Sequence, residues 1–567
     1  MCVLQSFDSL KFIKLEKSLK LIKTPDFIKI PNLEKLVLKG CINLCSLHPS
    51  IGVHQKLTFR NLKSCKNLKN LPSKFEIECL EILIFSGCSN LKRIPEFGEN
   101  MKSVLELYLD GTAITKLPTS IENLTSLVSL NVKDCKNLMS LPSTFFNMKW
   151  LKDLNLSGCS KLLENLMIEK SVEEFGVSVT TTGLMPHSNA LFQTLKKIAF
   201  GGFKPRSPNR MGLLLTSLSS LCSLTRLNLS YCNLNAIPND ICCLSSLKYL
   251  CLSVNNFGCL PENIAQLSIL KILVVDNCTS LQSWPKLPLN IIYIGGKGCT
   301  SLEMLPDLLQ QNSLFGSILY LTNCSKLAES QGFIDMYFAM IIKNLRLPLS
   351  HSVLNRYRYS IVFPRSEIPK WFRHQSIGDE VSIQETYSLL CNEWIGIAVC
   401  AVFCSHPHHQ ILKEGSLAGW LIVNGKQMHR APSTGNIVPL SDHTWLLYWL
   451  PQFYEGESIK IKSLWECNAN GFSHIGIKIV AYGKVLEPLL VKKCGLRMIY
   501  KKDIEDLNFD NSLAAVAEGY KAKQTRDDYD GARSSNYEPH LKRIERLTDF
   551  MAEETSEYKE CAEELGD

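Results

Sequence analysis

The sequence predicts a solenoid of parallel β-strands over residues 1–349, followed by an all-β sandwich over residues 350–505. The first observation is a repeat of about 23 residues, visible in LEKLVLKGCINL (33–44), LEILIFSGCSNL (80–91) and LVSLNVKDCKNL (127–138). The second is a change of pattern after residue 350, where short β-branched and aromatic runs replace the repeat. The third is a composition of 45% hydrophobic and 20% charged residues. This composition is typical of a globular protein, and no apolar run is long enough to span a bilayer.

The repeated pattern is L-x-x-L-x-L-x-x-[C/T/N], and thirteen copies align. Leucines at this spacing turn one side of a short strand inward, and strands of successive copies stack about 4.7 to 4.9 Å apart over one continuous core. The pattern resembles the leucine-rich repeat. In LPTSIENLTSL (117–127), the proline opens a turn, and the apolar spacing predicts a short helical or 3₁₀ segment on the back side. The first domain is therefore expected to be an α/β leucine-rich-repeat solenoid.

One position of the repeat, the cysteine column, recurs in every copy. It falls at residues 18, 41, 65, 88, 112, 135, 159, 203, 232, 255, 278, 299 and 324, and nine of these are cysteines. A disulfide or metal ladder is one interpretation, since neighbouring strands bring Cα atoms within disulfide range. Thr112 and Asn255 stand in the same column and cannot form disulfides. We therefore expect reduced thiols that hydrogen-bond the backbone of the next turn.

Two segments depart from the repeat. Residues 165–223 interrupt the period with a Thr/Ser/Gly-rich stretch and a basic, proline-containing one, and the weak copy that starts at Leu195 falls within them. They read as an insertion, which is either a loop on a binding face or a neutral loop. Residues 506–567 carry 16 acidic against 8 basic residues. They predict an acidic tail without stable structure.

The second domain is predicted from eight short strands. They are 359–363, 380–383, 395–404, 419–425, 443–450, 458–465, 474–482 and 496–500. Their β-branched and aromatic residues, with Gly, Pro and Asn between them, favour a jelly-roll or Ig-like sandwich. The strings FPRSEIPKWFRHQSIGDEVSI (363–383), SDHTWLLYW (441–449) and VKKCGLRMIY (491–500) carry a second resemblance. They are similar to the C-terminal jelly-roll/Ig-like domain that follows the repeats in plant intracellular immune receptors.

Those receptors form the Toll/interleukin-receptor-like, nucleotide-binding, leucine-rich-repeat class, of the TMV-resistance-protein-like kind, and the chain resembles their C-terminal part. The resemblance implies a recognition module for a pathogen effector protein or a host protein, with the nucleotide-binding region of a receptor as a further partner. The first twenty residues mix Lys and Glu into the apolar positions and cannot serve as a signal-peptide core, so we expect a cytoplasmic or nuclear location. A non-immune protein–protein scaffold or adaptor is the alternative of another class. We do not expect nucleic acid as a partner, because the net charge of +8 is diffuse.

Partner binding is expected on the concave strand face and on the loops of the β-domain. The concave residues that we expect to point outward are Val37, Lys39, Tyr108, Asp110, Asn131, Lys133, Tyr231, Asp276 and Tyr320. A second group is expected to hold the β-domain together, with Trp371 buried. It comprises Pro364, Glu367, Ile368, Pro369, Trp371 and Phe372.

The sequence offers little for catalysis. In the resembled family the NAD-cleaving and nucleotide-binding domains precede the repeats, and no G-x-x-x-x-G-K-[ST] motif is found in this chain. Cys400 and Cys404 would lie about 13 Å apart on one strand face, whereas zinc-bound sulfurs lie within about 4 Å of each other. We therefore expect no catalytic residue, metal or cofactor. An enzyme hidden in the β-domain stays as a further alternative.

Overall fold

The computed structural model describes residues 7–163, 220–303, 305, 318–329, 359–386, 390, 393–406, 414–431, 433–449, 472–483 and 488–505. The chain divides into two compact units, Met1–Glu329 and Ser330–Asp567. None of the helices in the described ranges is long and apolar enough to cross a membrane.

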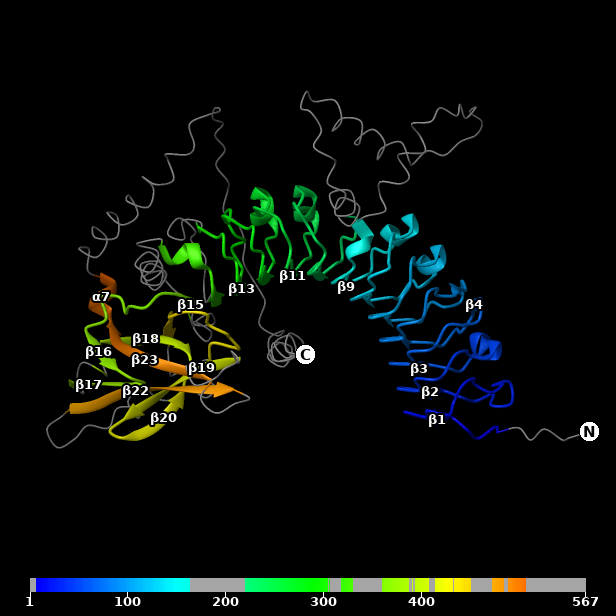
Figure 1. Cartoon of the computed structure of the whole chain (residues 1–567), viewed down its shortest axis with the longest axis horizontal. Coiled ribbons are helices and arrows are strands. Elements are labelled where there is room, and N and C mark those ends of the chain that lie inside the picture. Colours follow the sequence, from blue (N-terminus) through cyan, green and yellow to red (C-terminus); the bar gives the residue numbers. More distant parts are fainter. Residues whose placement is uncertain are drawn as a thin grey trace, which may run out of the picture. The chain divides into compact units, whose positions relative to one another are not determined.

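The first unit is a solenoid whose described ranges contain twelve three-residue strands in one parallel sheet. They are β1 (Phe12–Lys14), β2 (Lys35–Val37), β3 (Phe59–Asn61), β5 (Ile82–Ile84), β7 (Glu106–Tyr108), β8 (Ser129–Asn131), β9 (Asp153–Asn155), β10 (Arg226–Asn228), β11 (Tyr249–Cys251), β12 (Ile272–Val274), β13 (Tyr293–Gly295) and β14 (Ile318–Tyr320). Each strand pairs in register with the next, so that Leu107 lies opposite Leu130 and Leu130 opposite Leu154. The strands line the inner side of the arc in Figure 1. The predicted solenoid is confirmed.

The back of the solenoid is built from short 3₁₀ helices and one small strand pair. These elements are η1 (Pro49–Val53), η2 (Thr119–Asn123), η3 (Ser143–Asn147), η4 (Ser160–Leu163), η6 (Asn239–Cys243), η7 (Glu262–Gln266) and η8 (Ser325–Glu329), with β4 (Lys74–Phe75) paired to β6 (Glu96–Phe97). Proline stands immediately before η2, η3, η6 and η7, where its fixed φ suits a helix start. The described back side is thus 3₁₀ apart from this strand pair, and a short α-helix, α7 (Lys501–Glu505), lies in the second unit.

The nine cysteines of the column are free thiols whose side chains point into the core. Each donates a hydrogen bond of 2.8–3.3 Å to a backbone carbonyl, as Cys65 does to Leu38 and Cys159 to Val132. The acceptor lies three residues before the column position of the preceding repeat. The expected bond to the next turn is therefore wrong in direction, because the thiol lies beneath the turn that comes before it.

The ladder continues directly from β9 to β10, with Asp153 opposite Arg226. No strand lies between them, so the repeat predicted to start at Leu195 is not a step of this ladder. Leu195 itself lies outside the described residues, as do Phe203 of the predicted column and most of the predicted insertion.

The residue before the column has a positive φ in each of the twelve repeats. These residues are Lys17, Gly40, Ser64, Gly87, Gly111, Asp134, Gly158, Tyr231, Val254, Asn277, Gly298 and Asn323. Glycine takes this left-handed conformation without a Cβ clash, whereas a β-branched residue such as Val254 adopts it at a cost. The chain turns sharply at this point and leaves the sheet.

The second unit contains two antiparallel sheets. The first has the order β15–β21–β18–β23–β16, built from β15 (Tyr359–Pro364), β21 (His443–Trp449), β18 (Trp394–Ser405), β23 (Leu489–Tyr500) and β16 (His374–Ile377). The second has the order β17–β22–β19–β20, built from β17 (Glu380–Thr386), β22 (Phe472–Gly483), β19 (Gly415–Val423) and β20 (Lys426–Arg430). Strands β17, β19 and β22 contact β23. The antiparallel sheets support the predicted sandwich; residues 458–465, predicted as a strand, lie outside the described residues.

The segment after β15 packs over β23. A Cβ on Gly495 would meet Ile368 Cγ2 at 3.1 Å and Phe372 Cδ1 at 3.3 Å. Ile368, Phe372, Pro364 and Pro369 are buried, and Glu367 is exposed. Trp371 is only half-buried, which corrects the expectation that it is buried. It stacks on Phe372 at 4.0 Å between ring centroids, and Arg497 Nη1 donates to its carbonyl at 3.1 Å.

Candidate functional site

The concave face is formed by the outward side chains of the twelve strands. Within each strand the middle residue, such as Leu107, points into the core, and its two neighbours point out. Because adjacent parallel strands stand about 4.8 Å apart, outward side chains form continuous rows across the repeats. A ligand on this face would therefore meet a rigid array whose spacing is set by the backbone.

The nine predicted partner-binding residues differ in how much surface they show. Lys39, Lys133 and Tyr231 are exposed, the last with 60% of its surface. Tyr108, Asp110, Asn131 and Asp276 are half-buried. Val37 and Tyr320 are only 8% and 6% exposed, so the expectation that they present surface is wrong.

Neighbouring side chains account for the two buried residues. Val37 lies in the sheet between Lys14 and Asn61, its partners on the two adjacent strands. Tyr320 meets the ring of Tyr293 edge to face at 5.7 Å between centroids, and Lys297 Nζ lies 5.5 Å from the centre of its ring. A side chain on the outer face of a sheet is therefore buried when bulky side chains of adjacent strands lie beside it.

Several polar groups of the concave face are held by the protein itself. Ser86 Oγ donates to Asp110 Oδ1 at 2.6 Å, and the Tyr108 hydroxyl donates to Glu106 Oε2 at 2.8 Å. Burial, followed by this bond to Glu106, raises the pKa of Tyr108 well above its usual value. Asn131 Oδ1 accepts from the Lys133 backbone N–H at 2.9 Å, as a turn cap. These side chains are oriented before any partner arrives.

Asp276 occupies a more enclosed position further along the ladder. Its Oδ1 accepts from the Lys297 backbone N–H at 2.8 Å. Burial raises the pKa of this carboxyl, partly offset by the charge of Lys297. By contrast, Lys39 and Lys133 form no ion pair with any described residue, so their charges are available to a partner.

Sequence reasoning missed the first outward position of each strand, where Glu106, Asp153 and Arg226 stand. It considered only the later outward position and residues of the turn that follows the strand. Arg226 Nε lies 3.7 Å from Asp153 Oδ2, and its guanidinium lies 4.9 Å from the centre of the Tyr249 ring. Asp153, Arg226 and Tyr249 come from the successive strands β9, β10 and β11. The alternation of inward and outward residues along a strand could have identified these first outward positions as well.

Tyr231 reaches the surface by a different route. It stands in the turn after β10 with φ +56°, one residue before the cysteine column, and not between two leucines of the strand. Its exposure therefore comes from the sharp turn.

Among the described residues, no group of three or more His, Cys, Asp or Glu is placed to hold a metal ion.

Two parts of the chain match known protein families. Residues 75–171 match the leucine-rich repeats of the RPS4B-like disease resistance proteins, and residues 363–505 match the C-JID domain. The chain thus carries leucine-rich repeats of the plant disease-resistance type together with a C-JID domain.

Individual relatives agree with that class. The chain is 32% identical to TMV resistance protein N of Nicotiana glutinosa, over 69% of this chain and 34% of that protein. It is 30% identical to the disease resistance-like protein DSC1 of Arabidopsis thaliana, over 88% of this chain and 42% of that protein. The chain therefore spans well under half the length of these relatives. Among solved structures, the Leptospira interrogans leucine-rich-repeat protein LIC12759 is 21% identical with a TM-score of 0.25, covering 50% of this chain and 71% of that one.

Proposed function

We propose that this chain is the recognition part of a plant disease resistance receptor, which binds a pathogen effector protein or a host protein and thereby regulates defence signalling. Binding takes place on the concave face and the loops of the β-domain, inside the cell, and involves no catalysis by this chain. The nucleotide-binding region of a receptor is a further partner in this proposal.

The observation that carries the proposal is the state of the concave side chains between β7 and β10. Asp110 and Asn131 are fixed by hydrogen bonds, while Lys133 after β8 and Tyr231 after β10 are exposed. A pre-oriented surface loses little side-chain entropy on binding, and exposed tyrosines are frequent anchors of protein interfaces. The resistance-type repeats and the C-JID domain support a protein partner.

A binding selection tests this. A yeast-displayed library of pathogen effector proteins is sorted on the purified full chain, and each binder is titrated against variants. Lys133→Glu and Tyr231→Ala should each weaken binding by about tenfold or more, the loss typical of an interface anchor. Lys149→Glu, at an exposed lysine two residues after η3 and outside the strand face, is the matched control and should change affinity less than about twofold.

The opposite result is equally clear. Binders that are lost with Lys149→Glu and kept with both concave variants would contradict the concave face as the binding surface. Melting temperatures of all three variants within about 2 °C of the parent show that the comparison reports binding and not folding, because surface substitutions rarely cost more than about 0.5 kcal/mol.

A further inference from the structure

One flank of the first seven repeats carries charge of a single sign. It consists of the residues that follow the cysteine column by one to five positions. Nine of them are basic and all nine are exposed: Lys20, Lys23, Lys66, Lys69, Lys92, Arg93, Lys116, Lys136 and Lys161. We call them the basic flank. No described residue at these positions of the seven repeats is acidic; Glu164, the one carboxylate there in the sequence, lies outside the described residues.

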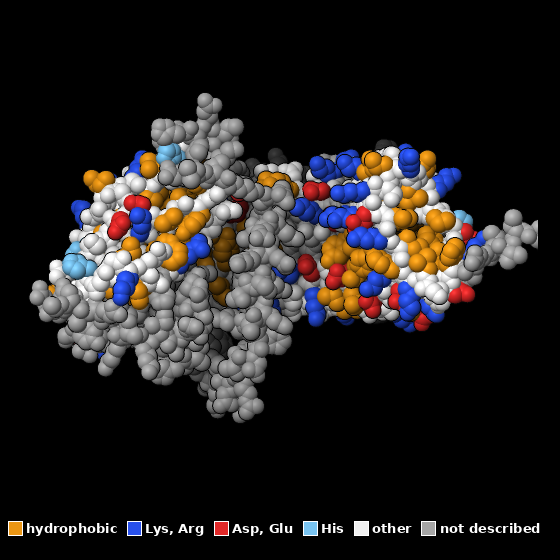
Figure 2. All heavy atoms as spheres, turned by 90° about the horizontal axis from the view of Figure 1, so that it is seen from below, with side chains coloured by type: hydrophobic (Ala, Val, Ile, Leu, Met, Phe, Trp, Pro, Cys, Tyr) orange, Lys and Arg blue, Asp and Glu red, His pale blue; other side chains and the backbone are white. Residues whose placement is uncertain are grey.

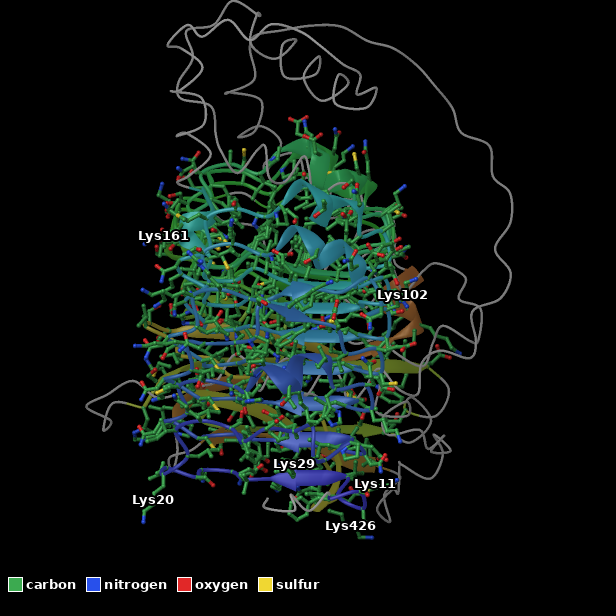
Figure 3. All side chains as sticks on the ribbon, turned by 90° about the vertical axis from the view of Figure 1, so that its right-hand side faces the viewer. Lys11, Lys20, Lys29, Lys102, Lys161 and Lys426 are labelled. Carbon is green, nitrogen blue, oxygen red and sulfur yellow. The ribbon has the colours of Figure 1, made fainter. Side chains whose placement is uncertain are left out.

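The basic flank differs from the same positions of the last five repeats and from the residues ahead of the first strands. The corresponding positions of the last five repeats hold Lys326, Glu303 and Glu329, and Lys326 pairs with Glu303. Ahead of the strands, Lys11 pairs with Glu34 at 2.8 Å. None of the nine basic-flank residues forms an ion pair with a described residue; Lys161 Nζ donates to Asn137 Oδ1 at 3.2 Å. Lys20 and Lys161 project to one side in Figure 3, and Lys11 and Lys102 to the other.

A row of unpaired like charges lowers the stability of the folded chain by self-repulsion, and an anionic partner would remove that cost. Figure 2 shows blue side chains gathered along one edge of the solenoid, with orange ones nearby. Exposed apolar side chains lie on the same flank, namely Leu19, Ile22, Ile42 and Met139, which are between 36% and 58% exposed. The surface therefore offers cations and small apolar contacts together.

These features distinguish among polyanions. Only one of the nine cations is an arginine, and the flank positions carry no described aromatic residue. Single-stranded nucleic acid is bound largely by stacking on aromatic rings and by arginine, which this surface lacks. A segment in which aspartate and glutamate alternate with apolar residues would match both the cations and the exposed apolar side chains of the basic flank. We propose that the basic flank is a second docking surface, separate from the concave face, for an acidic, partly apolar segment of a partner protein.

The test uses the full chain and a fluorescein-labelled synthetic peptide of five Glu-Glu-Leu units, followed by anisotropy at 50 and 500 mM NaCl. Saturable binding that weakens at the higher salt is expected, because exposed charges are screened within a few ångströms there. The variant Lys66→Glu/Lys69→Glu/Lys92→Glu should weaken binding by about tenfold or more. The control Lys102→Glu/Lys149→Glu/Lys152→Glu changes the net charge equally and should cost less than about twofold.

Other outcomes would overturn the proposal. The first is that the peptide does not bind, and the second is that both triple variants lose the same affinity for it. The third is that a Glu-Glu-Ser peptide binds with the same affinity as the Glu-Glu-Leu peptide. The fourth is that single-stranded DNA or anionic vesicles bind more tightly than the peptide. Salt-sensitive self-association would also overturn the proposal, because it would assign the basic flank to a second copy of this chain. Residues 549–567 of that copy hold eight carboxylates and one lysine. If the charge-reversed chain does not fold, Lys69→Gln/Lys92→Gln against Lys102→Gln/Lys149→Gln repeats the comparison.

Discussion

The thiol of Cys232 donates a hydrogen bond to the carbonyl of Leu156 at 3.3 Å, although 76 residues separate the two in the chain. The bond is equivalent to that from Cys159 to Val132 in the preceding step, which spans 27 residues. The ladder of thiols, like the sheet, therefore passes from the repeat of β9 to that of β10 without a break. Residues 163 and 220, where the described chain stops and resumes, therefore belong to two consecutive steps of the solenoid.

Removing residues 164–219 should leave the solenoid folded. A variant with residues 164–219 replaced by a short Gly/Ser linker keeps the pairing of β9 with β10 and loses no described contact. Loop length itself contributes little to stability, about 0.6 kcal/mol per doubling. We expect a melting temperature within about 4 °C of the parent. Loss of cooperative unfolding would show that the segment holds the two halves together.

The column thiols should react slowly and be free. Burial raises the pKa of Cys135 to about 11 and that of Cys324 to about 12, whereas Cys79, Cys222, Cys243 and Cys259 are exposed. At pH 8 a thiol reagent should modify these four exposed cysteines within minutes and the column cysteines only on unfolding, because burial keeps the reagent away from them. The unfolded chain should then titrate 23 thiols. Fewer, restored by a reductant, would indicate disulfides.

The same pKa shifts predict the pH dependence of stability. Between the ordinary thiol pKa and about 11, the folded state keeps the Cys135 proton that the unfolded state has lost. The free energy of unfolding therefore falls as pH rises through this range. Cys135→Thr, which copies Thr112, should reduce the fall in melting temperature between pH 8 and 10. An unchanged pH profile in the variant would contradict the assignment.

Arg60 should destabilise the solenoid. It stands in the register of Leu36 and Leu83 and is fully buried. Its Nη2 donates to the Ile51 carbonyl at 2.7 Å, while Nε and Nη1 have no hydrogen-bond partner. Because removing an unpaired buried charge often stabilises, Arg60→Leu should raise the free energy of unfolding by about 1 to 4 kcal/mol at pH 7.

The gain from Arg60→Leu should depend on pH. Burial lowers the pKa of Arg60 to about 9, so the folded parent loses this proton before the unfolded chain does. Its stability therefore rises with pH above about 9, and the advantage of Arg60→Leu should shrink between pH 8 and 10 in urea unfolding. A variant that is less stable than the parent at pH 7 would mean that the guanidinium is satisfied.

In the β-domain, Phe372 should contribute more stability than Trp371. Phe372 is 1% exposed and packs over Gly495, whereas Trp371 is half-buried. Phe372→Ala should cost about 3 to 5 kcal/mol, and Trp371→Ala about 2 kcal/mol. Hydrogen exchange of β23 amides in the full chain compares the two. If Trp371→Ala keeps the exchange rates of the parent and loses partner binding, this residue is an interface anchor and not a structural one.

The strands could be predicted because each one has a periodicity of its own. Every predicted strand of the β-domain that lies in the described ranges is found, since alternating apolar residues signal burial locally. β16 was missed because HQSI lacks that alternation, and its pairing with β23 is a long-range contact.

The concave face could be predicted only in part. Periodicity assigns Val37 and Tyr320 to the outer side of the sheet, but their burial depends on side chains of neighbouring repeats. The turn before the column was also missed, because glycine marks it in Gly40 and Gly298 while Lys17, Tyr231 and Val254 give no such signal. The basic flank could not be predicted from the net charge, because its nine cations are spread along the sequence and share one side only in the folded solenoid.

Photocrosslinking tests the concave face most directly. A photoreactive amino acid is placed at position 133 on the concave face, and in a second chain at position 149 in the turn between η3 and β9, both of which hold exposed lysines. Each chain is irradiated with a protein partner obtained from the selection. We predict a covalent adduct from position 133 and none above background from position 149. An adduct from position 149 alone would contradict recognition through the strand face.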